Sequence, residues 1–176
     1  MKRFIVGSIL AASLIALLNA HVFAQSTPMT EAHIDRIRAN CVEAQSTLMQ
    51  LHASDALLRV NRGQVYESIA TKLMAPFNNR VSISKLDGSS LSDLTTTYER
   101  QLGEFRTNYK SYEESMTRTL RINCTNQPVA FYDSITDTRA KRQLVHDSTQ
   151  ALQKTIQDYK NAFETFKQAF PEENKQ

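Results

Sequence analysis

Three long stretches of the chain carry apolar residues at alternating intervals of three and four, which is the pattern of a helix with one narrow apolar face. In the first stretch this pattern runs from residue 34 to residue 69, and Asp55 and Arg62 stand at two of its apolar positions. Such spacing predicts helices that pack side by side, as in coiled coils and bundles. The apolar positions of the first stretch are Ile34, Ile37, Cys41, Ala44, Leu48, Leu51, Leu58, Val65 and Ile69.

The second and third stretches have more aromatic residues at these positions. In the second they are Leu91, Leu94, Tyr98, Leu102, Phe105, Tyr109, Tyr112, Met116 and Leu120. In the third they are Phe131, Ile135, Val145, Leu152, Ile156, Tyr159, Phe163, Phe166 and Phe170. Because the aromatic residues of the second stretch follow helical spacing, we interpret them first as core residues and second as a platform for a ligand.

Prolines and turn residues separate the three stretches. We expect the first helix to end just before Pro76, because proline disfavours continuation of a helix. Residues 77–88 are then a connector, and the second helix begins at 89–92 and stops before residue 124. The third helix is expected to have Thr125 or Asn126 as its cap and Pro128 in its first turn.

The predicted fold is all-α, an elongated antiparallel three-helix bundle with coiled-coil-like apolar seams. The alternative is a compact four-helix bundle in which the first stretch splits at Ser54–Asp55, where the serine would cap a new helix. We favour three helices because the apolar spacing keeps its phase across Asp55.

The N-terminus has the features of an export signal. Lys2 and Arg3 precede an uncharged run over residues 4–24 that ends in small residues before Gln25. We expect residues 1–24 to be a signal peptide cleaved after Ala24, residues 25–170 to form the bundle and residues 171–176 to be a disordered tail. The alternative is an uncleaved membrane anchor, for which the apolar part is short.

Cleavage changes the charge balance of the chain. The full sequence has 21 basic and 18 acidic residues, and two of the basic residues lie in the signal, which leaves 19 against 18. Nucleic-acid binding needs a concentrated basic surface, whereas charges of both signs alternate here. The sequence therefore argues against a nucleic-acid partner.

Cys41 and Cys124 are the two cysteines of the chain. In an exported protein such a pair is typical of a disulfide. If the first two helices form an antiparallel hairpin, Cys41 and Cys124 lie at the same level, because they are symmetric about the middle of the predicted connector. We therefore predict a Cys41–Cys124 disulfide.

Polar residues in the first helix form a candidate ligand or register site, namely His52, Asp55 and Arg62. In the antiparallel register His52 lies level with Glu113, which predicts an ion pair. A metal site on helices needs ligands one turn apart, such as His-x-x-x-His or Glu-x-x-His, and the chain has neither, so no metal is expected.

Five basic residues approach one another if the first and third helices run parallel. A weak anion site is one interpretation of this group, and solvated positions on a long helix are the other. The five are Arg59, Arg62, Arg139, Lys141 and Arg142.

Motifs for catalysis are missing from the sequence. It has no Gly-x-Ser-x-Gly, no phosphate-binding loop, no His-Glu-x-x-His and no dinucleotide-binding glycine pattern. We expect no enzyme activity, no catalytic residue and no cofactor.

Three segments, residues 57–67, 122–124 and 127–133, resemble small exported helical proteins of candidate-phylum bacteria. No activity is assigned to that group, so the resemblance implies no binding residue and supports only an exported helical protein of bacterial origin.

The predicted function is an exported, non-enzymatic bundle that binds or scaffolds a macromolecular partner, a protein or other envelope component. The alternative is a small-molecule sensor or carrier with a pocket between helices near Asp55 and Arg62. Contact with a membrane is expected only if the signal segment is not cleaved.

Overall fold

The computed structural model describes residues 29–169, and these are helical apart from short connectors and contain no strand. The predicted signal peptide 1–24, its cleavage site and the tail 171–176 lie outside the described residues. The all-α prediction is confirmed. The elements are α1 (Glu31–Ala39), α2 (Cys41–Ser68), the π-helical turn η1 (Ile69–Met74), α3 (Ala75–Ile83), α4 (Ser89–Arg121) and α5 (Pro128–Gln168).

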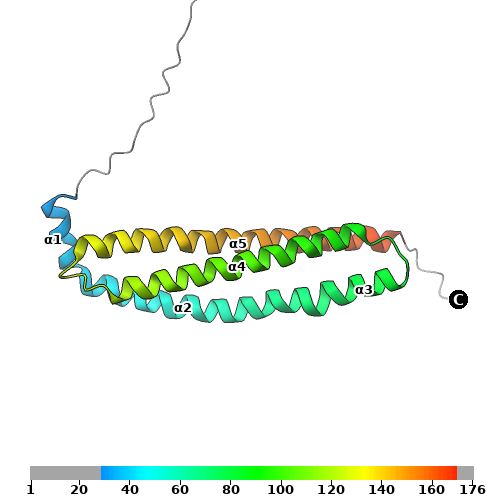
Figure 1. Ribbon diagram of the computed structural model, residues 1–176, viewed down its shortest axis with the longest axis horizontal. Coiled ribbons are helices and arrows are strands. Elements are labelled where there is room, and N and C mark those ends of the chain that lie inside the picture. Colours follow the sequence, from blue (N-terminus) through cyan, green and yellow to red (C-terminus); the bar gives the residue numbers. More distant parts are fainter. Residues whose placement is uncertain (1–28, 170–176) are drawn as a thin grey trace, which may run out of the picture.

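Three long helical rods make up an elongated molecule (Figure 1). The first rod is the continuous run α2–η1–α3, α4 returns antiparallel to it, and α5 runs parallel to the first rod again. α4 packs along α5 over most of its length, whereas α2 contacts mainly α4. α1 is a short separate helix at one end, where it contacts the beginning of α5.

The first predicted helix does split, but at Asn40 rather than at Ser54–Asp55. The Asn40 side-chain amide donates to the Arg36 carbonyl at 2.8 Å and thereby satisfies a carbonyl at the end of α1. α2 then continues through Ser54 and Asp55 without interruption. The structure therefore lacks the break on which the four-helix alternative depended.

The prediction that the first helix ends before Pro76 is wrong. η1 precedes the proline, and its wider turn is closed by a bond from the Ala75 N–H to the Ala70 carbonyl, five residues back. A π-helical turn moves the preceding carbonyls out of the α-helical positions with which a proline ring collides. The rod therefore continues as α3 with Pro76 in its first turn.

The connector between α3 and α4 is consequently short, over residues 84–88 instead of 77–88. Gly88 is required there, because a Cβ at this position would lie 2.6 Å from Cγ1 of Val81. α4 begins and ends where the sequence predicted. α5 begins at Pro128 as expected, but Gln127 occupies the cap position and its side chain makes no capping bond.

Burial along the first rod departs from the predicted pattern. Leu58 and Val65 are 47% and 55% exposed, whereas Tyr66 and Met74 are 5% and 1% exposed. A straight α-helix drifts by about 20° per heptad relative to a strict seven-residue repeat. Over the heptads between Cys41 and Tyr66 this drift adds up to about one residue position, so the predicted phase turns away from the core.

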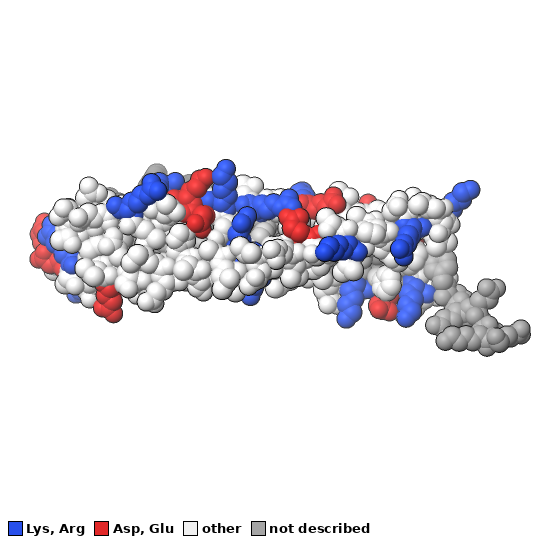
Figure 2. Space-filling view, turned by 90° about the horizontal axis from the view of Figure 1, so that it is seen from below, with Lys and Arg blue, Asp and Glu red and all other residues white. Residues whose placement is uncertain are grey.

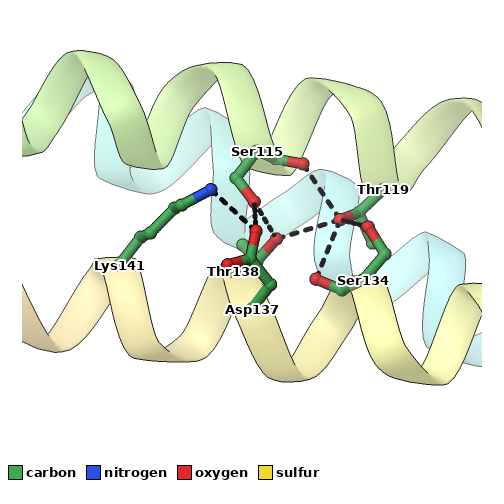
Figure 3. Close-up of polar contacts among 6 residues, drawn as sticks. All are labelled: Ser115, Thr119, Ser134, Asp137, Thr138 and Lys141. Carbon is green, nitrogen blue, oxygen red and sulfur yellow. Dashed lines mark hydrogen bonds and ion pairs between the residues drawn. The ribbon is translucent and has the colours of Figure 1, made fainter.

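The α4–α5 interface is rich in hydroxyl groups. Near the loop that joins the two helices, Thr119 Oγ1 lies 2.6 Å from Ser134 Oγ and 2.9 Å from Thr138 Oγ1, which lies 2.8 Å from Ser115 Oγ (Figure 3). Buried hydroxyls that bond to one another avoid the cost of unpaired polar groups. Further along α5, Ser148, Thr149 and Thr155 are buried as well. Small side chains at these positions allow the two helices to approach closely.

The predicted Cys41–Cys124 disulfide is present, with the two Cα atoms 5.6 Å apart. It joins the first residue of α2 to the loop between α4 and α5. Both cysteines are buried against Phe131, and Ile37 and Leu48 pack against this cluster. The bridge therefore fixes one end of the first rod to the α4–α5 hairpin.

Loss of this disulfide should destabilise the protein. Because the bridge closes a loop between residues 83 apart in sequence, Cys41→Ser should lower the free energy of unfolding by about 2–5 kcal/mol. Cys124→Ser should cost the same, and the double variant little more than either, because all three remove one bond. Denaturant unfolding measures this, and two free thiols in the unreduced, denatured wild type would contradict it.

Candidate functional site

A cleft opens between α2 and α5 in the middle of the bundle, and α4 forms its floor. Its volume is about 510 Å³. We call it the α2–α5 cleft. It is lined from α2 by Asp55, Leu58, Arg59 and Arg62, from α4 by Phe105, Tyr109 and Tyr112, and from α5 by Arg139, Arg142, Gln143, Val145, His146 and Thr149.

The cleft lies beside residues 56–65 of α2, which include three of its lining residues, Leu58, Arg59 and Arg62. At one end of this segment Leu51 packs against the core around Tyr112. At the other end Tyr66 rejoins the core and packs edge-on against Phe105, with ring centres 5.6 Å apart. Between them α2 has no buried residue. The large apolar residues of this interval, Leu57, Leu58, Val60 and Val65, are 47–64% exposed, so this part of α2 does not close onto α5.

Asp55 ties α2 to both neighbouring helices at the edge of the cleft. Its carboxylate accepts hydrogen bonds from Arg142 Nε at 2.8 Å and Nη2 at 3.0 Å, and from the Tyr112 hydroxyl at 2.6 Å. Burial raises the pKa of Asp55, but the bonds from Arg142 and Tyr112 outweigh burial and hold that pKa below its ordinary value. Asp55 therefore remains an anion at neutral pH.

The floor of the cleft is aromatic, and its hydroxyl groups are already engaged. Tyr112 donates to Asp55, and Tyr109 donates to Glu113 Oε2 at 3.0 Å. Burial, followed by the bond to Glu113 and the charge of Glu113, raises the pKa of Tyr109 to about 12. The Arg59 guanidinium lies 4.8 Å from the centre of the Tyr109 ring, within cation–π distance. The floor thus presents ring surface rather than free hydroxyls.

His52 lies outside the cleft, next to this network. Its Nε2 is 2.6 Å from Glu113 Oε1, so the predicted pairing of these two residues is present. The pair supports the antiparallel register of α2 and α4. Of the three predicted ligand or register residues, Asp55 and Arg62 line the cleft. His52 contacts Glu113, which also accepts the hydrogen bond from Tyr109 of the floor.

Four of the five basic residues that the sequence grouped together line the cleft. Arg59 and Arg62 lie on the α2 side, and Arg139 and Arg142 lie on the α5 side. The fifth, Lys141, instead pairs with Asp137 one turn away, at 2.7 Å (Figure 3). Within residues 29–169, Arg59, Arg62 and Arg139 form no ion pair with a carboxylate.

Ser115, Asp137 and Lys141 form a hydrogen-bonded group between α4 and α5. Ser115 donates to Asp137 at 2.9 Å, and Asp137 also accepts from Lys141 (Figure 3). These bonds, the one from Lys141 first, lower the pKa of Asp137, which makes its carboxylate a weak base. Ser115 is 1% exposed. The group therefore fits the role of joining α4 to α5 better than that of a nucleophile.

The described residues offer neither a metal site nor a membrane-spanning helix. In that part of the chain no three histidine, cysteine, aspartate or glutamate residues gather in a way that could hold a metal ion. None of its helices is both long and apolar enough to cross a bilayer.

Sequence reasoning missed some residues of the site. His146 and Thr149 line the cleft but were not singled out, because they lie off the apolar positions of α5. Tyr66 closes one end of the cleft, and it was missed because the predicted phase placed Val65 inside. The sequence signal for this face was the four-residue spacing of Tyr66, Ala70 and Met74. All three are buried in the structure.

The Asp55 tie gives a pH-dependent prediction. Asp55→Asn should lower the free energy of unfolding by about 1–3 kcal/mol at pH 7, because it removes the charge that both donors bind. Since the pKa of Asp55 is lowered in the folded state, this stabilisation is present above about pH 4 and is lost as pH falls through the folded value. The difference between wild type and variant should therefore shrink in acid.

The matched control is Asp158→Asn, which breaks the exposed pair with Lys154 on α5. It should change stability by no more than about 0.5 kcal/mol. Urea unfolding at several pH values measures both variants, and equal losses at Asp55 and Asp158 would contradict the proposed tie.

Comparisons with protein-family models, curated proteins and solved structures found no significant match for this chain.

Proposed function

We propose that this protein is an exported, non-enzymatic binding protein that holds a small molecule with an apolar body in the α2–α5 cleft. The observation that carries this proposal is the aromatic floor of Phe105, Tyr109 and Tyr112 at the bottom of a cleft walled by two helices. This was the alternative function expected from the sequence, with its pocket near Asp55 and Arg62.

The size and lining of the cleft support this proposal. A volume of about 510 Å³ falls within the range of roughly 300–1,000 Å³ that is usual for small-molecule sites. Such sites combine apolar and aromatic walls with a few polar groups that fix orientation. Here Phe105, Leu58 and Val145 supply apolar surface, and the arginines on the two sides supply polar groups.

The remaining features of the chain agree with a binding role outside the cytoplasm. A disulfide is typical of proteins that work in an oxidising compartment, and the N-terminal residues have the pattern of an export signal. The sequence lacks the catalytic motifs that would point to an enzyme. Sensing or carrying a ligand needs no chemistry at the site.

A macromolecular partner, the first function expected from the sequence, stays a prediction. It is favoured by exposed apolar residues of α2 that follow helical spacing, Val42, Met49, Leu57 and Val60. Figure 2 shows a face of the bundle on which charges of both signs gather along one part and a broad area carries no charge. Envelope proteins captured equally by wild type and by a Val42→Ser, Met49→Ser variant would contradict this role for α2.

Binding in the cleft can be tested with the neutral fluorescent probe N-phenyl-1-naphthylamine. Wild-type protein should enhance its fluorescence in a saturable manner. Leu58→Trp places a larger side chain at the cleft wall, and it should weaken probe binding by about tenfold or more, because it occupies space that the probe needs.

The matched control is Leu57→Trp at the neighbouring position, which is 64% exposed and does not line the cleft. It should leave probe binding unchanged, and circular dichroism should show the same helix content for both variants. Absence of saturable binding to wild type, or equal loss in the two variants, would overturn the proposed function.

A further inference from the structure

The walls of the α2–α5 cleft carry an excess of positive charge. Four arginines line it, and Asp55 is its one carboxylate. Asp55 is bound by Arg142 in a two-pronged ion pair, which neutralises that arginine. Among residues 29–169, three guanidinium groups of this cleft therefore have no carboxylate partner, those of Arg59, Arg62 and Arg139.

These three groups stand on opposite sides of the aromatic floor. Arg59 and Arg62 belong to α2, whereas Arg139 belongs to α5. Arg59 already lies over the Tyr109 ring, so its position is held by the floor itself. Arg62 and Arg139 are exposed side chains, which leaves their donors accessible to a bound molecule. An anion bound beside either of them would supply an opposite charge.

A purely ionic ligand does not match the aromatic floor of the cleft. The hydroxyls of Tyr109 and Tyr112 donate to Glu113 and Asp55, so they are not available to an anion, and Phe105 has no polar atom. Ring surface of this kind favours a flat or apolar body. The two requirements together describe a molecule with an apolar body and an anionic group at its edge.

We propose that the ligand of the α2–α5 cleft is an amphipathic anion, a small aromatic or acyl compound bearing a carboxylate, sulfonate or phosphate. The apolar body lies against the cleft lining around Phe105, Tyr109 and Tyr112, and the anionic group binds Arg62 or Arg139. This inference rests on the proposed function and adds the chemical class of the ligand to it.

Two probes with the same ring system separate the charge from the apolar body. 8-Anilinonaphthalene-1-sulfonate is N-phenyl-1-naphthylamine with one added sulfonate. The anionic probe should bind wild-type protein about tenfold more tightly than the neutral one, through charge-assisted hydrogen bonds. Added salt should weaken binding of the anionic probe and leave the neutral probe unaffected, because salt screens the exposed guanidinium groups.

The decisive variant is Arg62→Gln, Arg139→Gln. It should reduce the affinity for the anionic probe to that of the neutral probe, about a tenfold loss, and leave the neutral probe unchanged. The charge-matched control is Lys72→Gln, Lys160→Gln, which removes two exposed positive charges that do not line the cleft. This control should keep the preference for the anionic probe.

Equal affinity of wild type for the two probes would overturn the inference and leave the proposed function standing. The same conclusion follows if the lysine variant loses as much as the arginine variant, because the effect would then come from net charge. If neither probe binds, or if Leu58→Trp fails to block them, the proposed function falls together with the inference.

Discussion

The close packing of α4 against α5 is the constraint on which the rest of the molecule depends. Small hydroxyl side chains lie in this interface, and those near the α4–α5 loop bond to one another, so that polar groups can be buried where the helices approach closely. Four large aromatic residues of α4 also contact α2, since each has a bond or ring contact to that helix or lies beneath one of its side chains. These are Tyr98, Phe105, Tyr109 and Tyr112.

Because α4 and α5 form the closely packed pair, the first rod is held against them at separate points along its length. It is fixed near one end by the Cys41–Cys124 disulfide, near its middle by the Asp55 tie, and beyond that by the burial of Tyr66 and Met74. Between Asp55 and Tyr66 it has no buried residue. The cleft lies beside this part of the rod, and the aromatic residues of its floor, Phe105, Tyr109 and Tyr112, belong to the buried core.

Local spacing was enough to predict the helices and several of their contacts. The bounds of α4, the disulfide and the His52–Glu113 pair follow from apolar periodicity and an antiparallel register. Two features depended on geometry that a single sequence does not display. The π-helical turn before Pro76 keeps the rod continuous. Helical drift places Tyr66 in the core, where the predicted phase placed Val65. Both act on the first rod.

The candidate site was predicted in its residues more than in its shape. Asp55, Arg62 and the neighbouring arginines were grouped from the parallel course of two helices, and four of the five basic residues do line one cleft. The cleft itself could not be predicted, because it requires α2 to stand away from α5 just where the apolar pattern suggested close packing. Lys141 pairs with Asp137 and does not line the cleft. Apolar periodicity does not determine which nearby partner a lysine binds.

Hydrogen exchange of the backbone amides, followed by mass spectrometry, tests most directly whether the first rod is held at both ends of the cleft and free between them. Local opening is easiest where few apolar contacts are buried, so amides of residues 56–65 should exchange faster than those of residues 66–74 and of α4. Uniform protection along the whole of α2 and η1, equal to that of α4, would contradict this account of the cleft.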